Sequence, residues 1–375
     1  AELVRRFAGG SDVAGPGKIP ASAVLVRWAL PDRPPMPHLR QRCFDTLDEL
    51  PPQEVPVEAG GGAVQPLWIS VRVPAEAKPG EYKGKVTVSA QGQKPVVVPL
   101  EVKVIDWKLP DSKEFTTFMD LIQSPDTLAV RYKVKMWSEE HWKLIDRSFD
   151  LIGRLSGGSL YIPLIAKTHF GNAHSMVQWV ANGDGKYGHD FSIVERYVAT
   201  AAGHLGKVQV ACAYCWEPAK VPAHYNHNNF LGEREILLSV KDPNTGELLV
   251  TRGPDWGTPE CTEFWRPVLE GVRKIIERHE ITRPMMIGLC NDFEPTQGAV
   301  DNLTAASGGA KWVVHSHVGS WLTKGVRGRP VGYLSCLWGM YGARDPDQPV
   351  YGLRPAGLVD NRRPVIEIES LAQAY

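Results

Sequence analysis

The feature that most constrains the fold of this sequence is a change of pattern near residue 110. Before that point, short apolar runs alternate with turns rich in glycine and proline, and no segment shows the period of a helix. The strongest strand patterns lie at residues 23–28, 67–73, 82–88 and 95–105. After that point, strand-length runs alternate with amphipathic segments of helical period. We therefore predict a multi-domain chain, with an all-β sandwich at residues 1–110 and an α/β domain at residues 111–375.

Seven strands are expected in the α/β domain, at residues 115–119, 159–165, 207–214, 285–290, 311–315, 330–337 and 364–368. Ser138 and Thr258 each precede an acidic residue and an apolar stripe at helical spacing, so a capped helix is predicted after each. Either Asp190 or Ser192 is expected to cap a further helix. Repeated βα units of this kind predict a TIM-type (β/α)8 barrel. Because Tyr375 follows directly after the seventh strand, we expect the barrel to be truncated before its last strand.

Composition excludes several classes of function. Lysine plus arginine equals aspartate plus glutamate, at 42 each, so no excess of charge favours nucleic acid or an anionic membrane. There is no apolar run of transmembrane length and no glycine motif for phosphates or dinucleotides, so no membrane span and no cofactor are expected. Six cysteines in 375 residues do not predict a disulfide scaffold. Twelve tryptophans are compatible with platforms for sugar rings, although tryptophan is also ordinary core material.

The candidate catalytic residues lie in the stretch from Met285 to Pro295. An apolar run of strand length ends there in Asn291, Asp292 and Glu294, and the following proline cannot continue the strand. Side chains two residues apart on a strand point to the same side, so Asp292 and Glu294 would leave together, with Cα atoms about 6.7 Å apart.

Two carboxylates at that distance do not ionise independently, and one of them is pushed toward its protonated form. A proton donor beside an anion is what glycoside hydrolysis requires. We interpret Glu294 as the acid and Asp292 as the anion that orients the substrate and stabilises the intermediate. The alternative is that both residues supply negative charge at the start of a helix.

Other polar and aromatic residues also follow predicted strands. Glu217 ends the third strand of the α/β domain as Glu294 ends the fourth, and several aromatic residues, including Tyr341, lie near the sixth. We expect the following residues to bind substrate: Trp216, Glu217, Asn291, His315, His317, Tyr333 and Trp338. The alternative is core packing for the aromatic residues and a charge that leads into a helix for Glu217.

The two histidines at His315 and His317 have the spacing of a zinc site. Zinc requires a third ligand and a fixed second shell, for which Asp292 or Glu294 is available in the sequence. Histidines at the rim of a barrel more often bind sugar hydroxyls or pack, so no metal is predicted.

Three runs of the sequence resemble the N-terminal sandwich of glycoside hydrolase family 123-like proteins. They are residues 65–68, 73–84 and 102–111, and the resemblance extends over roughly residues 60–300. The resemblance implies a sandwich followed by a (β/α)8 barrel, and an exo-acting β-N-acetylgalactosaminidase that uses the acetamido group of its substrate as nucleophile. It also implies an extracellular or periplasmic location. The catalytic pair of that family is an adjacent Asp-Glu, whereas Phe293 separates Asp292 from Glu294 here.

Two alternatives to this mechanism remain open. Many barrel glycosidases place a nucleophilic glutamate after the seventh strand, and Glu294 as acid/base with Glu369 as nucleophile would fit that layout. The acids Glu367 and Glu369 also fit a strand that alternates toward solvent. The second alternative is a non-catalytic carbohydrate-binding protein on a degenerate barrel. The oligomeric state is not predicted.

Overall fold

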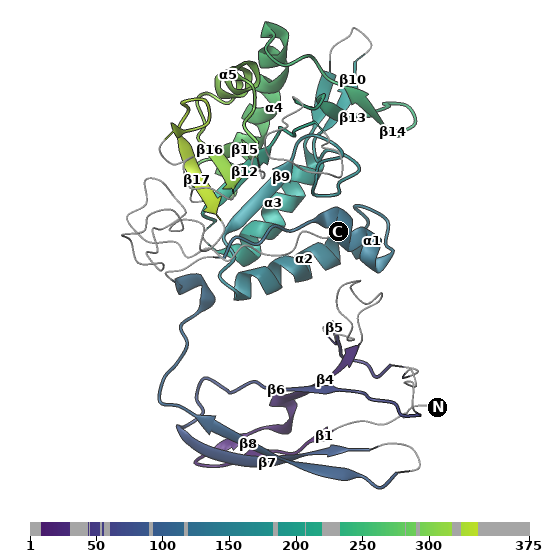
Figure 1. Cartoon of the computed structure of the whole chain (residues 1–375), viewed down its shortest axis with the longest axis vertical. Helices are drawn as coiled ribbons and strands as arrows, with labels where there is room; N and C mark the ends of the chain where they lie inside the picture. Colours follow the sequence, from purple (N-terminus) through teal and green to yellow (C-terminus); the bar gives the residue numbers. More distant parts are fainter. Residues whose placement is uncertain are drawn as a thin grey trace. The chain divides into compact units, whose positions relative to one another are not determined.

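The computed structural model describes residues 9–30, 44, 46–52, 55, 61–89, 93–115, 119–182, 187–206, 208–219, 233–281, 283–289, 293–316 and 324–336. The chain divides into two compact units, Ala1–Leu109 and Pro110–Tyr375 (Figure 1). In the described residues, every sheet draws its strands from one unit alone. No helix among them is long and apolar enough to cross a membrane.

The first unit contains two antiparallel sheets. In one, β7 (Gly80–Val88) pairs with β1 (Gly9–Gly10), β2 (Val13–Ala14) and β8 (Val96–Val104), and β2 pairs with β3 (Lys18–Ile19). In the other, β4 (Val24–Leu30) lies between β5 (Thr46–Asp48) and β6 (Leu67–Val71), and the short helix η1 (Ala21–Ala23) precedes β4. One hydrophobic cluster includes Tyr82 and Val86 from the first sheet and Val24 from the second. The two sheets therefore share a core.

The second unit is built around a parallel sheet. The structure describes five of its strands: β9 (Ser159–Pro163), β12 (Val210–Tyr214), β15 (Met286–Leu289), β16 (Trp312–Ser316) and β17 (Val331–Cys336). Each strand lies beside the one before it in this series, so among the described strands β9 and β17 are the two edges and β15 is central. Met119 also forms a parallel bridge with Gly157 just before β9. The strand predicted at residues 364–368 lies outside the described residues.

Helices connect these strands, and the second, third and fourth of the five α-helices among the described residues are those that the sequence predicts. After η2 (Ser112–Glu114) and α1 (Pro125–Tyr132), α2 (Glu139–Arg154) precedes β9, α3 (Ser192–Leu205) precedes β12, α4 (Pro259–Arg278) precedes β15 and α5 (Gln297–Ala306) precedes β16. Ser138 accepts a hydrogen bond from the backbone N–H of His141, and Thr258 accepts one from that of Cys261. Both predicted caps are confirmed. Asp190 accepts from the backbone N–H of Ser192 without being the residue at the N-cap position.

A second sheet in this unit was not predicted. It consists of β10 (Gln178–Ala181), β11 (Tyr187–Asp190), β13 (Leu237–Lys241) and β14 (Leu248–Arg252) in the order β11-β10-β13-β14. The two hairpins arise from the segments after β9 and after β12, and they join where β10 pairs in parallel with β13. Segments for which the sequence predicts no strand therefore form a four-stranded sheet.

Side chains of the five-stranded sheet divide between two faces. On β9, Leu160 and Ile162 belong to the main hydrophobic cluster, together with the apolar stripes of α2 to α5, whereas Tyr161 belongs to a separate cluster. That second cluster draws on four further strands and contains Tyr161, Val210, Cys212, Tyr214, Met286, Val313 and Tyr333. The helices therefore cover one face of the sheet, and the tyrosines gather on the other.

Candidate active site

The candidate site lies at the carboxyl ends of the parallel strands. Glu217 follows β12, Glu294 follows the central strand β15, and His315 lies near the end of β16. Since these three strands are neighbours and parallel, their carboxyl ends meet at one edge of the sheet. Ligands of parallel α/β sheets bind at this edge.

A buried aspartate, Asp120, lies at the centre of one polar cluster. Its Oδ2 accepts hydrogen bonds from the hydroxyls of Tyr161 (3.1 Å) and Tyr333 (2.9 Å), and lies 3.3 Å from Nε2 of His315. The Tyr161 hydroxyl also lies 2.7 Å from that nitrogen. Asp120 is only 4% exposed, and its other oxygen, Oδ1, has no hydrogen-bond partner among the described residues. A buried carboxylate with three polar neighbours is thus fixed beneath the site.

The contacts of Asp120 show that the parallel sheet is curved. Tyr161 comes from the edge strand β9 and Tyr333 from the opposite edge strand β17, yet their hydroxyls bind the same oxygen atom. In a flat sheet, four strand spacings would place those edges about 19 Å apart, with their side chains standing parallel. The sheet therefore bends so that both edges approach the face that carries the tyrosines.

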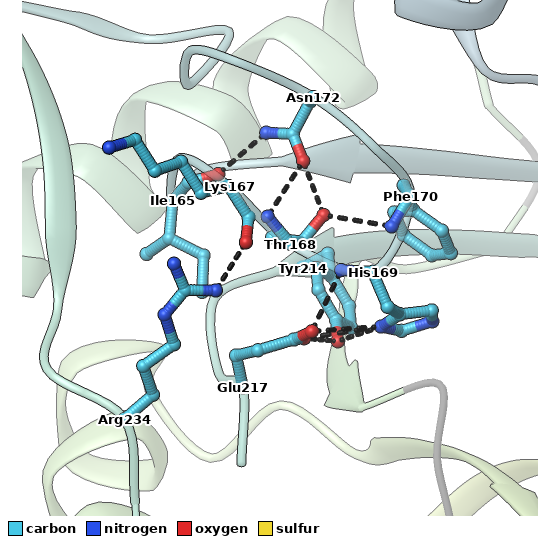
Figure 2. A network of polar contacts seen from close by, with 9 residues as sticks. All are labelled: Ile165, Lys167, Thr168, His169, Phe170, Asn172, Tyr214, Glu217 and Arg234. Carbon is cyan, nitrogen blue, oxygen red and sulfur yellow. Dashed lines mark hydrogen bonds and ion pairs between the residues drawn. The ribbon is translucent and has the colours of Figure 1, made fainter. Parts of the chain in front are cut away.

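A second cluster surrounds Glu217 (Figure 2). Its Oε1 accepts a hydrogen bond from the backbone N–H of His169 at 2.8 Å, and Nδ1 of the same residue lies 3.1 and 3.2 Å from the two carboxylate oxygens. Tyr214 donates its hydroxyl to Oε2. The side chain of Glu217 is 8% exposed, whereas that of His169 is 32% exposed. Glu217 therefore holds His169 by its backbone and its ring and leaves the ring partly open to solvent.

Phe170 joins the two clusters. Its ring centroid lies 4.8 Å from that of Tyr214, 6.2 Å from that of Tyr161 and 4.5 Å from that of His169. The Tyr161 ring in turn lies 5.5 Å from that of His315. Aromatic rings from β9, β12 and β16 and from the loop after β9 therefore form one continuous wall.

The loop that carries His169 and Phe170 is held by its own polar side chains (Figure 2). Asn172 Oδ1 accepts from the backbone N–H of Thr168 at 3.1 Å and from its hydroxyl, and Asn172 Nδ2 donates to the carbonyl of Ile165 at 2.9 Å. Both Asn172 and Thr168 are buried. The loop is therefore preorganised, and His169 and Phe170 are presented in fixed positions.

Glu294, the predicted acid, contacts a different segment. Its Oε1 accepts from the backbone N–H of Arg327 at 2.9 Å, and its Oε2 lies 3.8 Å from Lys324 Nζ and from Arg327 Nε. Both distances of 3.8 Å are too long for a direct hydrogen bond. The side chain is 24% exposed. Among the described residues, Glu294 is thus held by residues 324–327 and forms no hydrogen bond or ion pair with the Asp120 and Glu217 clusters.

The other predicted site residues are divided between core, cluster and undescribed segments. Trp216 is fully buried in the cluster on the helix side, where its Nε1 donates to Glu233 at 3.4 Å. His315, Glu217 and Tyr333 belong to the polar clusters described above. The remaining predicted residues lie outside the described residues: Asn291, Asp292, His317, Trp338, Tyr341, Glu367 and Glu369. In the described part, no group of three potential metal ligands lies together.

Four residues of these clusters were missing from the sequence analysis: Asp120, Tyr161, His169 and Tyr214. Asp120 had a signal, because it directly follows the strand predicted at residues 115–119 as Glu294 follows the fourth strand. The two tyrosines had none, since every residue of β9 and β12 is buried and no alternation separates the two faces.

The burial of His315 predicts a pH dependence of stability. Burial lowers the pKa of His315 and the nearby His169 lowers it further, while Asp120 opposes the shift. The unfolded state therefore binds this proton more readily, and stability is lost as pH falls through the ordinary histidine pKa of about 6.5. One such proton contributes a slope of at most about 1.4 kcal/mol per pH unit.

We expect His315→Gln to flatten the fall in stability between about pH 7 and pH 5 relative to the unchanged protein. Urea unfolding at several pH values measures this slope. His189 provides a second site for comparison, because burial lowers its pKa as well. An unchanged slope in His315→Gln would contradict the assignment to this residue.

Comparison with known proteins identifies the family. The sequence matches the profile described as "Glycoside hydrolase 123, catalytic domain" at residues 123–324, more than half of the chain, and "Glycoside hydrolase 123 N-terminal domain" at residues 40–90. No curated protein matches the sequence.

Among solved structures, the chain is similar to a family 123 glycoside hydrolase from Clostridium perfringens, described in connection with glycolipid glycan hydrolysis. The identity is 15% and the TM-score 0.61, and the match covers 92% of this chain and 59% of that one. The chain thus spans about three fifths of the length of that structure, and at this identity the likeness shows the fold alone. A cycloisomaltooligosaccharide glucanotransferase from Paenibacillus sp. matches with a TM-score of 0.19 at 10% identity, over 83% of this chain and 48% of that one, which carries no argument.

The family profile agrees with the resemblance noted in the sequence. The chain belongs to glycoside hydrolase family 123.

Proposed function

We propose that this chain is the catalytic part of a glycoside hydrolase that removes a terminal N-acetylhexosamine, with β-N-acetylgalactosaminide as the first substrate to test. The supporting observation is that carboxylates, histidines and aromatic rings converge at the carboxyl edge of the sheet in a chain that belongs to this family. Such a mixture of rings and hydrogen-bonding groups suits a sugar, whose faces are apolar and whose edges carry hydroxyls. An extracellular or periplasmic location is part of the proposal and rests on the family alone.

The proposal includes a (β/α)8 barrel preceded by a β-sandwich. The order of the five parallel strands is the order of a barrel, and the approach of both edge strands to Asp120 gives the curvature that a barrel requires. The shared core of the two antiparallel sheets supports a sandwich. On this proposal, Asp120 and the tyrosines lie inside the barrel beneath the sugar.

The proposed mechanism is substrate-assisted and retains the anomeric configuration. Glu294 donates a proton to the glycosidic oxygen while the carbonyl oxygen of the 2-acetamido group attacks the anomeric carbon, which gives an oxazolinium-like intermediate. Asp292, two residues away, orients the acetamido group and stabilises the positive charge. Water then opens the intermediate, and Glu294 removes its proton. The position of Glu294 after the central strand and the hydrogen bond from Arg327 to only one of its oxygens support this role.

The polar clusters are assigned to substrate binding. The ring of His169 is partly exposed, and its Nδ1 faces Glu217. Its other nitrogen, Nε2, does not contact that carboxylate and is available to bind a sugar hydroxyl. Phe170 provides an aromatic surface beside it. Glu217 then acts through His169 as a positioning residue and does not transfer the proton.

The substrate preference tests this mechanism. We expect chromogenic β-glycosides with a 2-acetamido group to be cleaved at least about 10²-fold faster than their 2-hydroxyl counterparts, because only the former carry the nucleophile. Asp292→Asn should reduce the rate by about 10²-fold through lost charge and orientation, and Glu369→Gln should have a much smaller effect. Steady-state kinetics on paired substrates measure all three effects.

Other results of these assays would favour one of the two alternative functions. A preference for 2-hydroxyl sugars with a severe loss in Glu369→Gln would indicate a retaining enzyme with a glutamate nucleophile. Binding of sugars without any turnover would favour a carbohydrate-binding protein.

A further inference from the structure

Arg327 occupies a tight turn that leads into β17. Val326 and Arg329 form an antiparallel bridge, in which each donates its backbone N–H to the carbonyl of the other, at 3.0 and 2.8 Å. Between them, Arg327 and Gly328 have φ angles of 47° and 76°. Positive φ at both central positions is the pattern of a type I′ turn, which glycine adopts freely and arginine rarely. Arg327 is therefore held in a conformation that its own preferences oppose.

The turn is anchored on both sides of Arg327. Val326 is completely buried in the main hydrophobic cluster. Arg329 donates from Nη2 to Oδ1 of Asp301 on α5 at 2.9 Å, and the carbonyl of Pro330 accepts a backbone N–H from the start of β16 at 3.0 Å. The surroundings of the turn therefore fix the position of Arg327, as strain of this kind requires.

Arg327 binds the segment that carries Glu294. Its backbone N–H donates to Oε1 of Glu294 at 2.9 Å, and its Nε donates to the carbonyl of Pro295 at 2.9 Å. Pro295 is buried, whereas the side chain of Arg327 is 40% exposed. One residue therefore holds both the carboxyl group of the proposed acid and the backbone that follows it.

The same segment is held from a second direction by Glu233. The backbone N–H of Thr296, which caps α5, donates to Oε1 of Glu233 at 2.6 Å. Arg327 lies in the segment after β16 and Glu233 in the segment after β12, and these are the strands on either side of β15. Residues 294–296 are thus tied to segments that follow both neighbouring strands.

The contacts of Arg327 distinguish the two oxygens of Glu294. A backbone N–H can only donate, so Oε1 acts as an acceptor and the proton of the acid form is carried by Oε2. Lys324 Nζ and Arg327 Nε each lie 3.8 Å from Oε2. These cations are therefore next to the oxygen on which negative charge develops when the proton leaves.

We propose that Arg327 is a positioning residue for the proton donor Glu294. Its backbone N–H holds Oε1, and its guanidinium fixes the peptide after Glu294, so that Oε2 stays directed at the departing oxygen. In the step that it supports, the acetamido oxygen forms a bond to the anomeric carbon, and the electron pair of the breaking glycosidic bond goes to the departing oxygen, which takes the proton from Oε2. The inference rests on the proposed function, because it assigns the proton to Glu294.

The test uses Arg327→Asn. Asparagine adopts the left-handed backbone more readily than arginine and keeps the N–H that binds Glu294, but it lacks the guanidinium that binds Pro295. For an alkyl β-glycoside of N-acetylgalactosamine, we expect kcat to fall about tenfold, because the proton donor is misplaced. For the nitrophenyl β-glycoside, which departs without a proton, we expect kcat to stay within about twofold. Equal losses on both glycosides, or no loss on either, would overturn the proposal.

Arg329→Asn is the matched control. Arg329 belongs to the same turn and loses the same group in this variant, but its guanidinium binds Asp301. We expect the ratio of the two kcat values to stay within about twofold of that of the unchanged protein. If Arg329→Asn shows the same selective loss as Arg327→Asn, the effect belongs to the turn as a whole and the assignment to Arg327 is wrong.

A double variant separates positioning of the proton from a general structural role. In Glu294→Gln there is no proton to position, so adding Arg327→Asn should lower kcat on the alkyl glycoside by no more than about a further twofold. A further tenfold loss would show that Arg327 acts independently of the proton donor, and would overturn the proposal.

Amide hydrogen exchange tests the same role without activity. We expect the amide of Thr296 to exchange at least about fivefold faster in Arg327→Asn than in the unchanged protein, and within about twofold in Arg329→Asn, because only the former releases Pro295. If the unchanged protein hydrolyses neither glycoside, the proposed function fails, and the exchange rates still decide whether Arg327 holds this segment. Equal exchange in Arg327→Asn and the unchanged protein overturns that role, whether or not the protein is active.

Discussion

Replacement of Glu294 by glutamine is expected to reduce kcat by about 10³-fold on substrates with poor leaving groups. Glutamine keeps the size of the side chain and an acceptor for the backbone N–H of Arg327, but it cannot donate the proton that the departing oxygen requires. Steady-state kinetics on glycosides with alkyl and with nitrophenyl leaving groups measure the effect. Because a nitrophenolate departs without a proton, the loss should be much smaller for that substrate than for the alkyl glycoside.

Glu217→Gln is the matched control for this prediction. Glu217 follows the neighbouring strand β12 and carries the same functional group, but its oxygens are occupied by Tyr214 and His169. We expect its replacement to raise KM through misplacement of His169, by a similar factor for both leaving groups. If the loss that depends on the leaving group occurs in Glu217→Gln and not in Glu294→Gln, the acid is Glu217 and the proposed assignment is wrong.

Local chemistry was sufficient to predict much of the secondary structure. The strands β6, β7 and β8 and the helices α2 and α4 carry their own periodicity, and Ser138 and Thr258 mark where the two helices begin. These signals act within a few residues, so they can be read without knowledge of the fold.

The second sheet shows where such reading fails. Trp179 on β10 pairs with Val240 on β13, and the contact forms only after two separate insertions come together. Each of the four strands has four or five residues, which is too short for a reliable period. Pairing between distant segments, and not local preference, therefore determines this sheet.

The candidate site shows the same division between residues with a local sequence signal and residues that only the assembled fold reveals. Glu217 and His315 were predicted because polar residues at the ends of parallel strands meet at a common edge, and Tyr333 was predicted as an aromatic residue near the sixth strand. Tyr161 could not be distinguished from its buried neighbours, since only the assembled sheet shows that it points away from the helices. Trp216 shows the opposite case, since it was predicted to bind substrate but its ring packs in the core on the helix side. The next residue, Glu217, joins the polar cluster.

Asp120→Ala is expected to cause the largest loss of stability, about 3 kcal/mol or more. The substitution leaves the hydroxyls of Tyr161 and Tyr333 and Nε2 of His315 without their shared carboxylate. Tyr161 keeps its contact with Nε2 of His315 at 2.7 Å. Each of the three groups nevertheless loses a buried hydrogen bond to a charged partner, which is worth about 1.5–3 kcal/mol. Urea unfolding at neutral pH measures the difference in free energy.

Two further variants serve as controls for the loss of stability expected in Asp120→Ala. Asp120→Asn keeps one carbonyl oxygen as an acceptor, and its amide can occupy the position of Oδ1, which has no partner among the described residues. We therefore expect it to lose only about 1 kcal/mol. Asp106→Ala removes an exposed aspartate and should leave stability unchanged within about 0.5 kcal/mol. Since Asp120 connects tyrosines from the two edge strands, a loss in Asp120→Ala as small as that in Asp106→Ala would mean that this carboxylate does not hold the curved sheet together.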